Sequence, residues 1–307
     1  MNRRDFVRLL SLGSASALCG CSTLPHLHSF EKLFKKTNSS QSEANDIAEV
    51  LATPAQPVLT PEQMTEEFLK DARTRSLYFS QDFPEDILIH GRKFELMQGL
   101  VRKFRAVQRH VGHGNFNLLG MDEFFRLAQT ASGAAEVTSE EKLFLEEMFY
   151  FDAKLYGFHG EKVFHKMTDI VKPGSTVKIP FTGHFLKRGE PVEIYNKIKK
   201  DVGNTVLVTS GVRALAKQYH LFFEKALETN GNMSKASRSL APPGYSFHGQ
   251  GDFDLGRKGY GYRNFTDDFA KTDEYRRLLD LGYVQIRYTQ SNLLGVRFEP
   301  WHIKVPA

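Results

Sequence analysis

Two short stretches near the C-terminus decide how this chain is interpreted: residues 246–255 read SFHGQGDFDL, and residues 299–302 read EPWH. The first stretch supplies an imidazole, His248, followed by aspartates. The second supplies another imidazole, His302, and the carboxylate of Glu299 just before it. Glycines surround His248, which is typical of a loop where backbone and side chains approach closely. These residues have the composition of a catalytic metal site.

A catalytic zinc ion takes three protein ligands with nitrogen or oxygen donors and leaves a fourth position to water. The metal lowers the pKa of that water toward about 7, and a nearby carboxylate takes its proton as the water attacks a carbonyl. His248, Asp254 and His302 as ligands, with Glu299 as the base, meet these requirements. The sequence therefore predicts a zinc hydrolase site.

The motifs resemble a known family. The spacing S-x-H-x-x-G followed by an aspartate, then E-x-W-H, is similar to that of the zinc D-Ala-D-Ala carboxypeptidases of the lysostaphin/D-Ala-D-Ala/sonic hedgehog superfamily, in particular the VanY-like group. Residues 210–213 (SGVR) with Gln218 resemble the family's S-G-[YF]-R segment, and residues 242–246 (PPGYS) resemble its P-P-G-x-S segment. The resemblance covers roughly residues 175–307.

The resemblance implies a role for each matching residue. His248, Asp254 and His302 become the zinc ligands, and Glu299 becomes the general base that also protonates the leaving amine. Arg213 would stabilise the oxyanion or bind the substrate carbonyl. Two further residues, Ser246 and Trp301, would shape the pocket or support the ligands, and Gln218 is placed with them.

The chain departs from the family pattern at the aspartate ligand. The family places this aspartate seven residues after the first histidine, where this chain has Leu255. A loop that is one residue shorter favours Asp254 as the ligand, because it keeps the Asp-Leu pair. Asp252 is the alternative, and whichever aspartate is spare would bind substrate or cap a turn.

The first 21 residues, MNRRDFVRLLSLGSASALCGC, have the pattern of an export signal: a basic start, a short apolar stretch and small residues before a cysteine. The run at 2–7 (NRRDFV) resembles a twin-arginine signal. The run at 18–21 (LCGC) resembles a lipobox, which predicts that Cys21 is lipidated and begins the mature chain. Ser22 after it favours the outer membrane. We therefore expect an exported protein on the periplasmic face, held at the membrane by a lipid anchor.

The chain has two cysteines, Cys19 and Cys21. Cleavage before Cys21 would remove Cys19, so that neither a disulfide nor a cysteine nucleophile is expected in the mature chain. Residues 22–59 are rich in Ser, Thr, Asn, Gln, Ala and Pro, which indicates a flexible tether with a root-mean-square span of roughly 35 Å.

Helical signals dominate residues 60–170, which we interpret as a helical accessory region. Thr60, followed by a proline and a glutamine, is typical of a helix start. Thr138 with Glu141 predicts a second capping box. An apolar stripe at helical spacing predicts a helix between them, formed by Phe94, Met97, Leu100, Val101, Phe104 and Val107.

From residue 171 onward the pattern changes to that of a small peptidase domain, 171–307. Short β-rich runs are predicted at 175–180, 205–209, 283–288 and 294–298, with one clear helix at about 213–229. Few strands with intervening helices indicate an α+β fold in which a small antiparallel sheet follows a mainly helical region.

The composition is that of an ordinary globular protein, with 41% hydrophobic and 25% charged residues. The formal net charge is +5, and part of this excess lies in the signal as Arg3, Arg4 and Arg8. Because no clustered basic face is evident, nucleic acid is not an expected partner.

The expected reaction is hydrolysis of a peptidoglycan stem peptide, most simply release of the terminal D-Ala by a D,D-carboxypeptidase. Cleavage of an L,D bond or of a cross-link is the alternative within the same superfamily, because the motifs do not encode the shape of the pocket. A non-catalytic wall-binding lipoprotein is a second alternative, although Glu299 argues against it, since a structural zinc site needs no base.

Overall fold

The computed structural model describes residues 66–306, so that the predicted signal, the tether and the helix start at Thr60 lie outside the described residues. The first half of the described chain is helical, and its longest helix is α5. These elements are α4 (Glu66–Leu77), α5 (Gly91–Val111), α6 (His113–Phe116), α7 (Met121–Ala128), α8 (Ser139–Tyr150) and the 3₁₀ turn η2 (Ala153–Tyr156).

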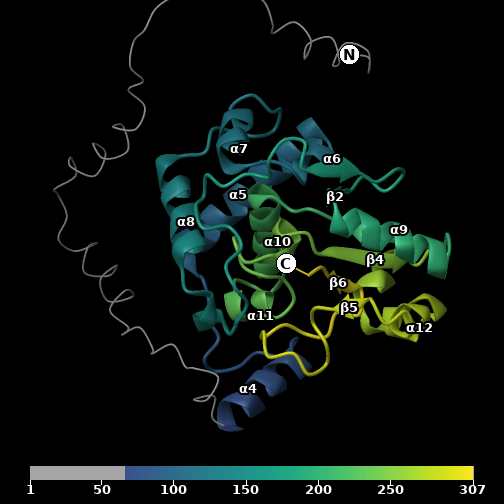
Figure 1. Ribbon diagram of the computed structural model, residues 1–307. Coiled ribbons are helices and arrows are strands. Elements are labelled where there is room, and N and C mark those ends of the chain that lie inside the picture. The colour runs from purple at the N-terminus through teal and green to yellow at the C-terminus, as the bar shows by residue number, and fades with distance from the viewer. Residues whose placement is uncertain (1–65, 307) are drawn as a thin grey trace, which may run out of the picture. The chain divides into compact units, whose positions relative to one another are not determined.

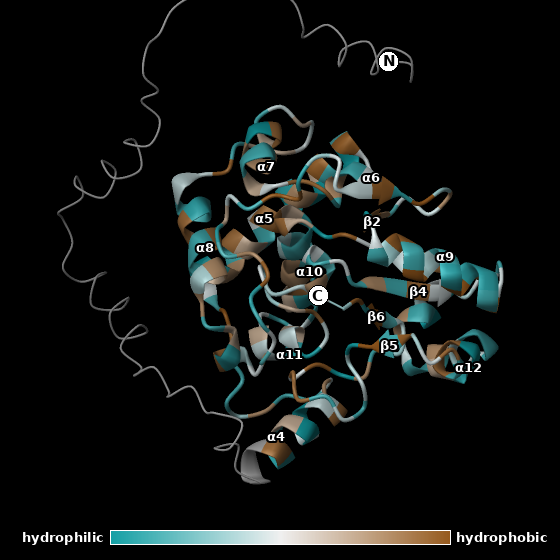
Figure 2. Cartoon of the chain, in the orientation of Figure 1, coloured by the Kyte–Doolittle hydropathy of each residue, from teal (hydrophilic) through white to brown (hydrophobic). Residues whose placement is uncertain are grey.

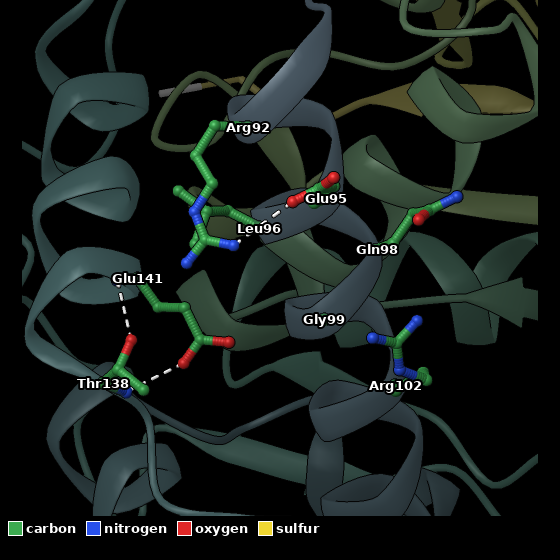
Figure 3. A pocket seen from close by; sticks show the side chains of 8 residues that line it. All are labelled: Arg92, Glu95, Leu96, Gln98, Gly99, Arg102, Thr138 and Glu141. Atoms are coloured by element: carbon green, nitrogen blue, oxygen red, sulfur yellow. Dashed lines mark hydrogen bonds and ion pairs between the residues drawn. The ribbon is translucent and has the colours of Figure 1, made fainter.

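Both helical signals in this half are confirmed. The apolar stripe of the sequence lies on α5, where Leu100 and Phe104 are fully buried. Thr138 accepts a hydrogen bond from the backbone N–H of Glu141 at the start of α8, and the Glu141 carboxylate accepts one from the backbone of Thr138 (Figure 3). This reciprocal pair satisfies two backbone donors that a helix start would otherwise leave free.

The second half mixes helices and strands. Its elements are β1 (Thr176–Lys178), β2 (Phe185–Lys187), α9 (Glu190–Val202), β3 (Val206–Ser210), α10 (Leu215–Glu228), α11 (Met233–Ser237), η3 (Phe247–Gly249), β4 (Phe253–Arg257), η4 (Gly261–Phe265), η5 (Asp267–Lys271), α12 (Asp273–Asp280), β5 (Gln285–Ile286) and β6 (His302–Lys304). Strands β1 and β2 form an antiparallel hairpin. The other four form one sheet in the order β3-β4-β6-β5, and all of its pairings are antiparallel.

Helices α9 and α12 pack beside this sheet, and together they enclose an apolar cluster (Figure 1). Ile198 of α9 and Leu278 of α12 are fully buried there against Phe253, Leu255 and Ile303 of the central strands. This cluster supports β4 and β6 from behind, which matters because both strands carry site residues.

A second and larger core lies around α10. Tyr219, Phe222 and Phe223 of α10 are buried in one cluster with Phe104 of α5 and Phe144 of α8. Figure 1 shows α10 between α5 and α8 on one side and the strands on the other, and Figure 2 shows apolar residues along α5 and α10. The predicted helical region thus shares its core with a helix of the predicted peptidase segment. The boundary between them stays a prediction.

The predicted elements of the second half differ from the structure in several places, and strands β2, β4 and β6 were not predicted at all. The prediction of a strand at 294–298 is wrong, because that segment forms no ladder. The carbonyl of Val296 instead accepts hydrogen bonds from the Ser76 hydroxyl and the Asn292 amide. Helices α9 and α12 were not predicted either, although both are short amphipathic helices with one buried face.

The predicted fold class, α+β with small antiparallel sheets, is confirmed. Among the described helices, none combines the length and the apolar composition that a bilayer crossing requires.

Candidate metal centre

The sheet register brings the aspartate and the second histidine of the predicted site together. Asp254 on β4 lies directly opposite His302 on β6, and directly opposed residues of an antiparallel pair have neighbouring side chains. On the other side of β4, the ladder to β3 is irregular between Val208 and Ser210, so that Ser210 comes opposite Asp254. This irregularity places the turn after β3, which carries Arg213, at the site.

His248 reaches the same point from the 3₁₀ turn η3. Its Nδ1 lies 2.8 Å from the carbonyl oxygen of Gly211. Because a carbonyl can only accept, Nδ1 carries the proton and Nε2 presents its lone pair. Gly211 must be a glycine for this approach, since a Cβ there would lie 2.0 Å from the carbonyl oxygen of Phe185 on β2.

The three side chains converge on one small volume. His248 Nε2 and His302 Nδ1 each lie 3.4 Å from Asp254 Oδ1, and one possible ligand atom from each residue lies within 4.8 Å of the others. All three residues are buried. Two of the facing atoms, His248 Nε2 and Asp254 Oδ1, have no hydrogen-bond partner.

Buried polar atoms without partners are costly, so a converging pair of them needs an explanation. Two imidazole nitrogens and one carboxylate oxygen form a donor set that suits Zn²⁺ with an open fourth position. The residues present therefore fit a catalytic zinc ion, and His248, Asp254 and His302 could hold it.

Asp252 lies on the opposite edge of the His302 ring and is fully engaged there. Its Oδ2 lies 3.0 Å from His302 Nε2. Arg287 donates two hydrogen bonds to the same carboxylate, at 2.7 and 2.9 Å, and the backbone N–H of Val305 donates a third at 2.9 Å. This contact orients the imidazole, which is the usual role of a carboxylate behind a metal-ligating histidine. The geometry thus separates the two aspartates between which the sequence left a choice.

His302 and Asp252 each stabilise the charged form of the other. Burial alone would lower the pKa of His302, but hydrogen bonds to Asp252 and Glu299 and the charge of Asp254 raise it to about 9. Burial would raise the pKa of Asp252, yet its hydrogen bonds to His302 and Arg287 lower it to about 2.

His248 behaves in the opposite way. Burial, together with the nearby positive charge of Arg213, lowers the pKa of His248 to about 4. The neighbouring carboxyl, Asp254, has its pKa lowered despite burial, because His248 and Arg213 stabilise its charged form. Arg213 makes this contact through Nη2, at 2.7 Å from Asp254 Oδ2. A neutral imidazole and an ionised carboxylate are the protonation states that a metal requires.

The predicted base and its neighbours line a cleft of about 330 Å³ beside the cluster. Glu299, Arg213, Asp254 and Trp301 all contribute to its wall. Glu299 is nearly buried, and its Oε2 lies 3.5 Å from His302 Nδ1. The cleft therefore gives a substrate access to the carboxylate, the guanidinium and the cluster at once.

Two of the predicted supporting residues lie behind this cleft. The Gln218 amide donates to the carbonyl of Arg213 and accepts from the backbone N–H of Gly244, both at 2.8 Å. Gln218 thereby joins the turn that carries Arg213 to the loop that leads into His248. Ser246 is buried immediately before η3.

The sequence did not single out several residues of this site. The largest omission is Arg287, which holds Asp252, because an arginine in a short strand-like run carries no signal of its own. The other omissions line the cleft, and they are His184, Lys217, Lys225 and Arg297. Lys217 directly precedes Gln218, which the sequence analysis did name, but no local sequence pattern indicates which way the Lys217 side chain points.

A second hollow, of about 400 Å³, lies between α5 and the start of α8 (Figure 3). Its carboxylates are already paired: Glu95 with Arg92, and Glu141 with Lys103 and the backbone of Thr138. It holds no histidine, and we assign it no chemistry.

The fold and the cluster define a small α+β domain built around a buried His-Asp-His centre. Residues 192–305 match the family model of VanY, described as D-alanyl-D-alanine carboxypeptidase. The matched segment contains the cluster, Glu299 and Arg213. The predicted resemblance to the VanY-like carboxypeptidases is therefore confirmed for this segment, and it supports a peptidase. No curated protein matches the chain.

Three solved structures show distant similarity. The LdcB LD-carboxypeptidase, whose structure concerns peptidoglycan recognition, is 20% identical, covers 44% of this chain and 69% of its own, and has a TM-score of 0.37. A mutant of the vancomycin-resistance D,D-pentapeptidase VanY in complex with Zn(II) is 22% identical. The match covers 42% of this chain and 76% of that one, with a TM-score of 0.31. VanYB in complex with D-alanine-D-alanine is 22% identical. The match covers 42% of this chain and 75% of that one, with a TM-score of 0.31.

Proposed function

We propose that this chain is a zinc-dependent peptidase that hydrolyses peptidoglycan stem peptides, and that it releases a terminal D-Ala as a D,D-carboxypeptidase. One observation carries the proposal: a buried His248–Asp254–His302 cluster with two unpartnered ligand atoms opens into a cleft that also contains Glu299 and Arg213. The family match over residues 192–305 supports the choice of reaction.

Zinc held by His248, Asp254 and His302 would supply Lewis-acid polarisation of the scissile carbonyl and would lower the pKa of the attacking water. Side chains and backbone groups of the chain would orient the ligands and move the proton. Arg287 and Asp252 keep the His302 ring in position, and the Gly211 carbonyl keeps the His248 tautomer that leaves Nε2 free.

Glu299 is placed to move the proton. It lies beside the cluster, on the cleft wall, with Arg297 3.9 Å away. Its carboxylate would accept a proton from the attacking water and deliver it to the leaving amine, so that one group serves both steps. Arg213, fixed by Asp254 and Ser210, presents its guanidinium at the same cleft, where it would stabilise negative charge developing on the carbonyl oxygen.

The test is a digest of three muropeptides by the purified chain, read by mass: a pentapeptide stem, a tetrapeptide stem and a cross-linked dimer. We expect loss of one alanine from the pentapeptide, inhibition by a chelator and recovery with zinc. Glu299→Ala should keep bound zinc and lose hydrolysis. Glu140→Ala, which removes an exposed carboxylate on α8, is the matched control and should cut normally.

Other products would change the proposal in defined ways. Cleavage of the tetrapeptide would indicate an L,D-carboxypeptidase, and cleavage of the dimer would indicate an endopeptidase. Bound zinc with all three substrates intact would replace the peptidase with a wall-binding lipoprotein. Hydrolysis that survives both the chelator and Glu299→Ala would contradict the mechanism.

We also propose that the chain is exported and anchored through Cys21, with the outer membrane as its destination. The support is the signal-like pattern of residues 1–21, which lie outside the described residues. In cells fed a labelled fatty acid, the chain should take up label, and Cys21→Ser should abolish the uptake. Cys19→Ser is the matched control and should leave labelling intact, whereas equal labelling of both variants would exclude the anchor.

A further inference from the structure

The cleft beside the cluster carries more positive than negative side chains. Its two carboxylates are Asp254 and Glu299, and both already face cations or ligand atoms of the site. The positive or imidazole groups on the wall are Arg213, Lys217, Lys225, Arg297 and His184. A ligand that enters this cleft therefore meets more positive charge than the carboxylates of its wall balance.

Among the cations on the cleft wall, Lys217 is the one whose charge is least balanced by nearby carboxylates. It lies in the first turn of α10 and is partly buried. Its Nζ donates to the neutral amide oxygen of Gln108 at 3.1 Å. Among residues 66–306, it takes part in no ion pair with a carboxylate. An ammonium group has three donors, so this contact leaves donors that can face the cleft.

Lys225 provides the contrast. It lies two turns along the same helix and lines the same cleft, but its Nζ is 3.0 Å from the Glu228 carboxylate. Lys217 is also poorly placed for helix stability, because a positive charge in a first turn opposes the helix dipole. Its Nζ also lies 5.9 Å from the centre of the Phe116 ring, but neither this ring nor the Gln108 amide carries a charge that balances the ammonium, whereas an incoming anion would.

The geometry points to Lys217 as the residue that binds a carboxylate of the substrate peptide and so determines which peptides the cleft accepts. This inference rests on the proposed peptidase function and names a specificity residue for it. Burial and the charge of Arg213 lower the pKa of Lys217 to about 8, which agrees with a lysine held for a partner that is not part of the chain.

A peptide can supply the carboxylate from two sources: its C-terminus, or an acidic side chain within the stem. A terminal source would agree with a carboxypeptidase, because Lys217 would then bind the carboxylate of the residue that is released. The experiment therefore uses one pentapeptide in three forms: with both carboxylates free, with the terminus amidated, and with the acidic side chain amidated.

KM and kcat are measured on each form for the wild-type chain, Lys217→Met, Lys217→Arg and the control Lys142→Met, an exposed lysine of α8. We expect Lys217→Met to raise KM for the free peptide about 10- to 100-fold, the usual effect of losing a charge-assisted hydrogen bond, with kcat and bound zinc little changed. Lys217→Arg should recover most of the affinity. The amide on which wild type and Lys217→Met become equal identifies the carboxylate.

An unchanged KM for Lys217→Met on all three forms, with zinc retained, would overturn the inference. Should that variant fail to fold, the wild-type chain decides alone, because an equal KM on both amides and the free peptide would equally exclude a carboxylate site. If the wild-type chain cut none of the peptides, the proposed function would fail. The same comparison, made with Kd for the uncut peptides, would still decide on Lys217.

Discussion

The core around Phe104 and the centre around His302 are buried to a similar degree, but the core consists of apolar side chains and the centre of charged and polar ones. Phe104 stacks on Phe124 with ring centroids 4.2 Å apart, inside a cluster of hydrocarbon side chains. His302 lies between the carboxylates of Asp252 and Asp254. Burial of hydrocarbon is favourable by itself, whereas burial of charge is costly unless each group is paired.

This difference separates stability from function within one compact unit. The aromatic core should carry the free energy of unfolding, and the charged centre should carry metal binding and catalysis. Each prediction below changes one of these two regions and asks whether the other responds.

The largest effect should follow from His302→Ala, which removes one of three ligands. Loss of a supporting partner of a ligand already costs about 10- to 100-fold in metal affinity, so loss of the ligand itself should exceed 100-fold and abolish hydrolysis. Bound zinc and muropeptide turnover are measured together. Turnover that persists after zinc is lost would contradict the assignment.

Phe104→Ala tests the other region. Removing a fully buried phenylalanine should lower the free energy of unfolding by about 3–5 kcal/mol, while the folded fraction keeps its zinc. Denaturant unfolding with parallel metal analysis measures this. The control is Leu143→Ala, since that side chain is 61% exposed on α8 and its loss should change little. Zinc loss from folded Phe104→Ala would show that the two regions are not separable.

Asp252→Asn is a smaller change at the centre. It keeps the size of the side chain but removes the charge that Arg287 and His302 both contact. Zinc affinity should fall about 10- to 100-fold, with the ion still bound at high zinc concentration. Competition with a chelator of known affinity gives the number. Complete loss of the site would instead make Asp252 a ligand.

The pH dependence of KM tests Lys217 without a mutation. The groups that act on its charge are Arg213, which lowers its pKa, and Glu224, which raises it, while Gln108 is neutral. The charged lysine exists below its pKa of about 8, so binding of a carboxylate should be constant below that pH. KM should then rise about tenfold by pH 9. In Lys217→Arg this rise should disappear, and an identical rise in that variant would assign it elsewhere.

The smallest effect is expected for Arg92→Ala, far from the centre. Arg92 pairs with Glu140 and with Glu95, and Figure 3 shows the pair with Glu95. Exposed pairs contribute little to stability because water and salt screen them. Neither zinc content nor turnover should change. A loss of activity in this variant would give the hollow between α5 and α8 a role that the structure does not indicate.

The sequence predicted the two regions to different extents, for physical reasons. The stripe on α5 and the capping box at Thr138 are local signals, since residues three and four apart meet on a helix face whatever the rest of the chain does. The structure brings His248, Asp254 and His302 together, and their spacing in the sequence could not show how they meet.

What the sequence could not supply is the register of the sheet. The choice between Asp252 and Asp254 depends on which residue lies opposite His302, and that follows from the pairing of β4 with β6. Arg287 and Lys217 enter the site through the same long-range pairing and through the packing of α10 on α5. No local pattern encodes such contacts.

The most direct test of the account is anomalous diffraction at the zinc edge from crystals of the zinc-loaded chain. The account predicts one ion within about 2.0–2.2 Å of His248 Nε2, Asp254 Oδ1 and His302 Nδ1, with Asp252 outside the coordination sphere. An ion bound by Asp252 and His302 Nε2, or no ion at the cluster, would contradict it.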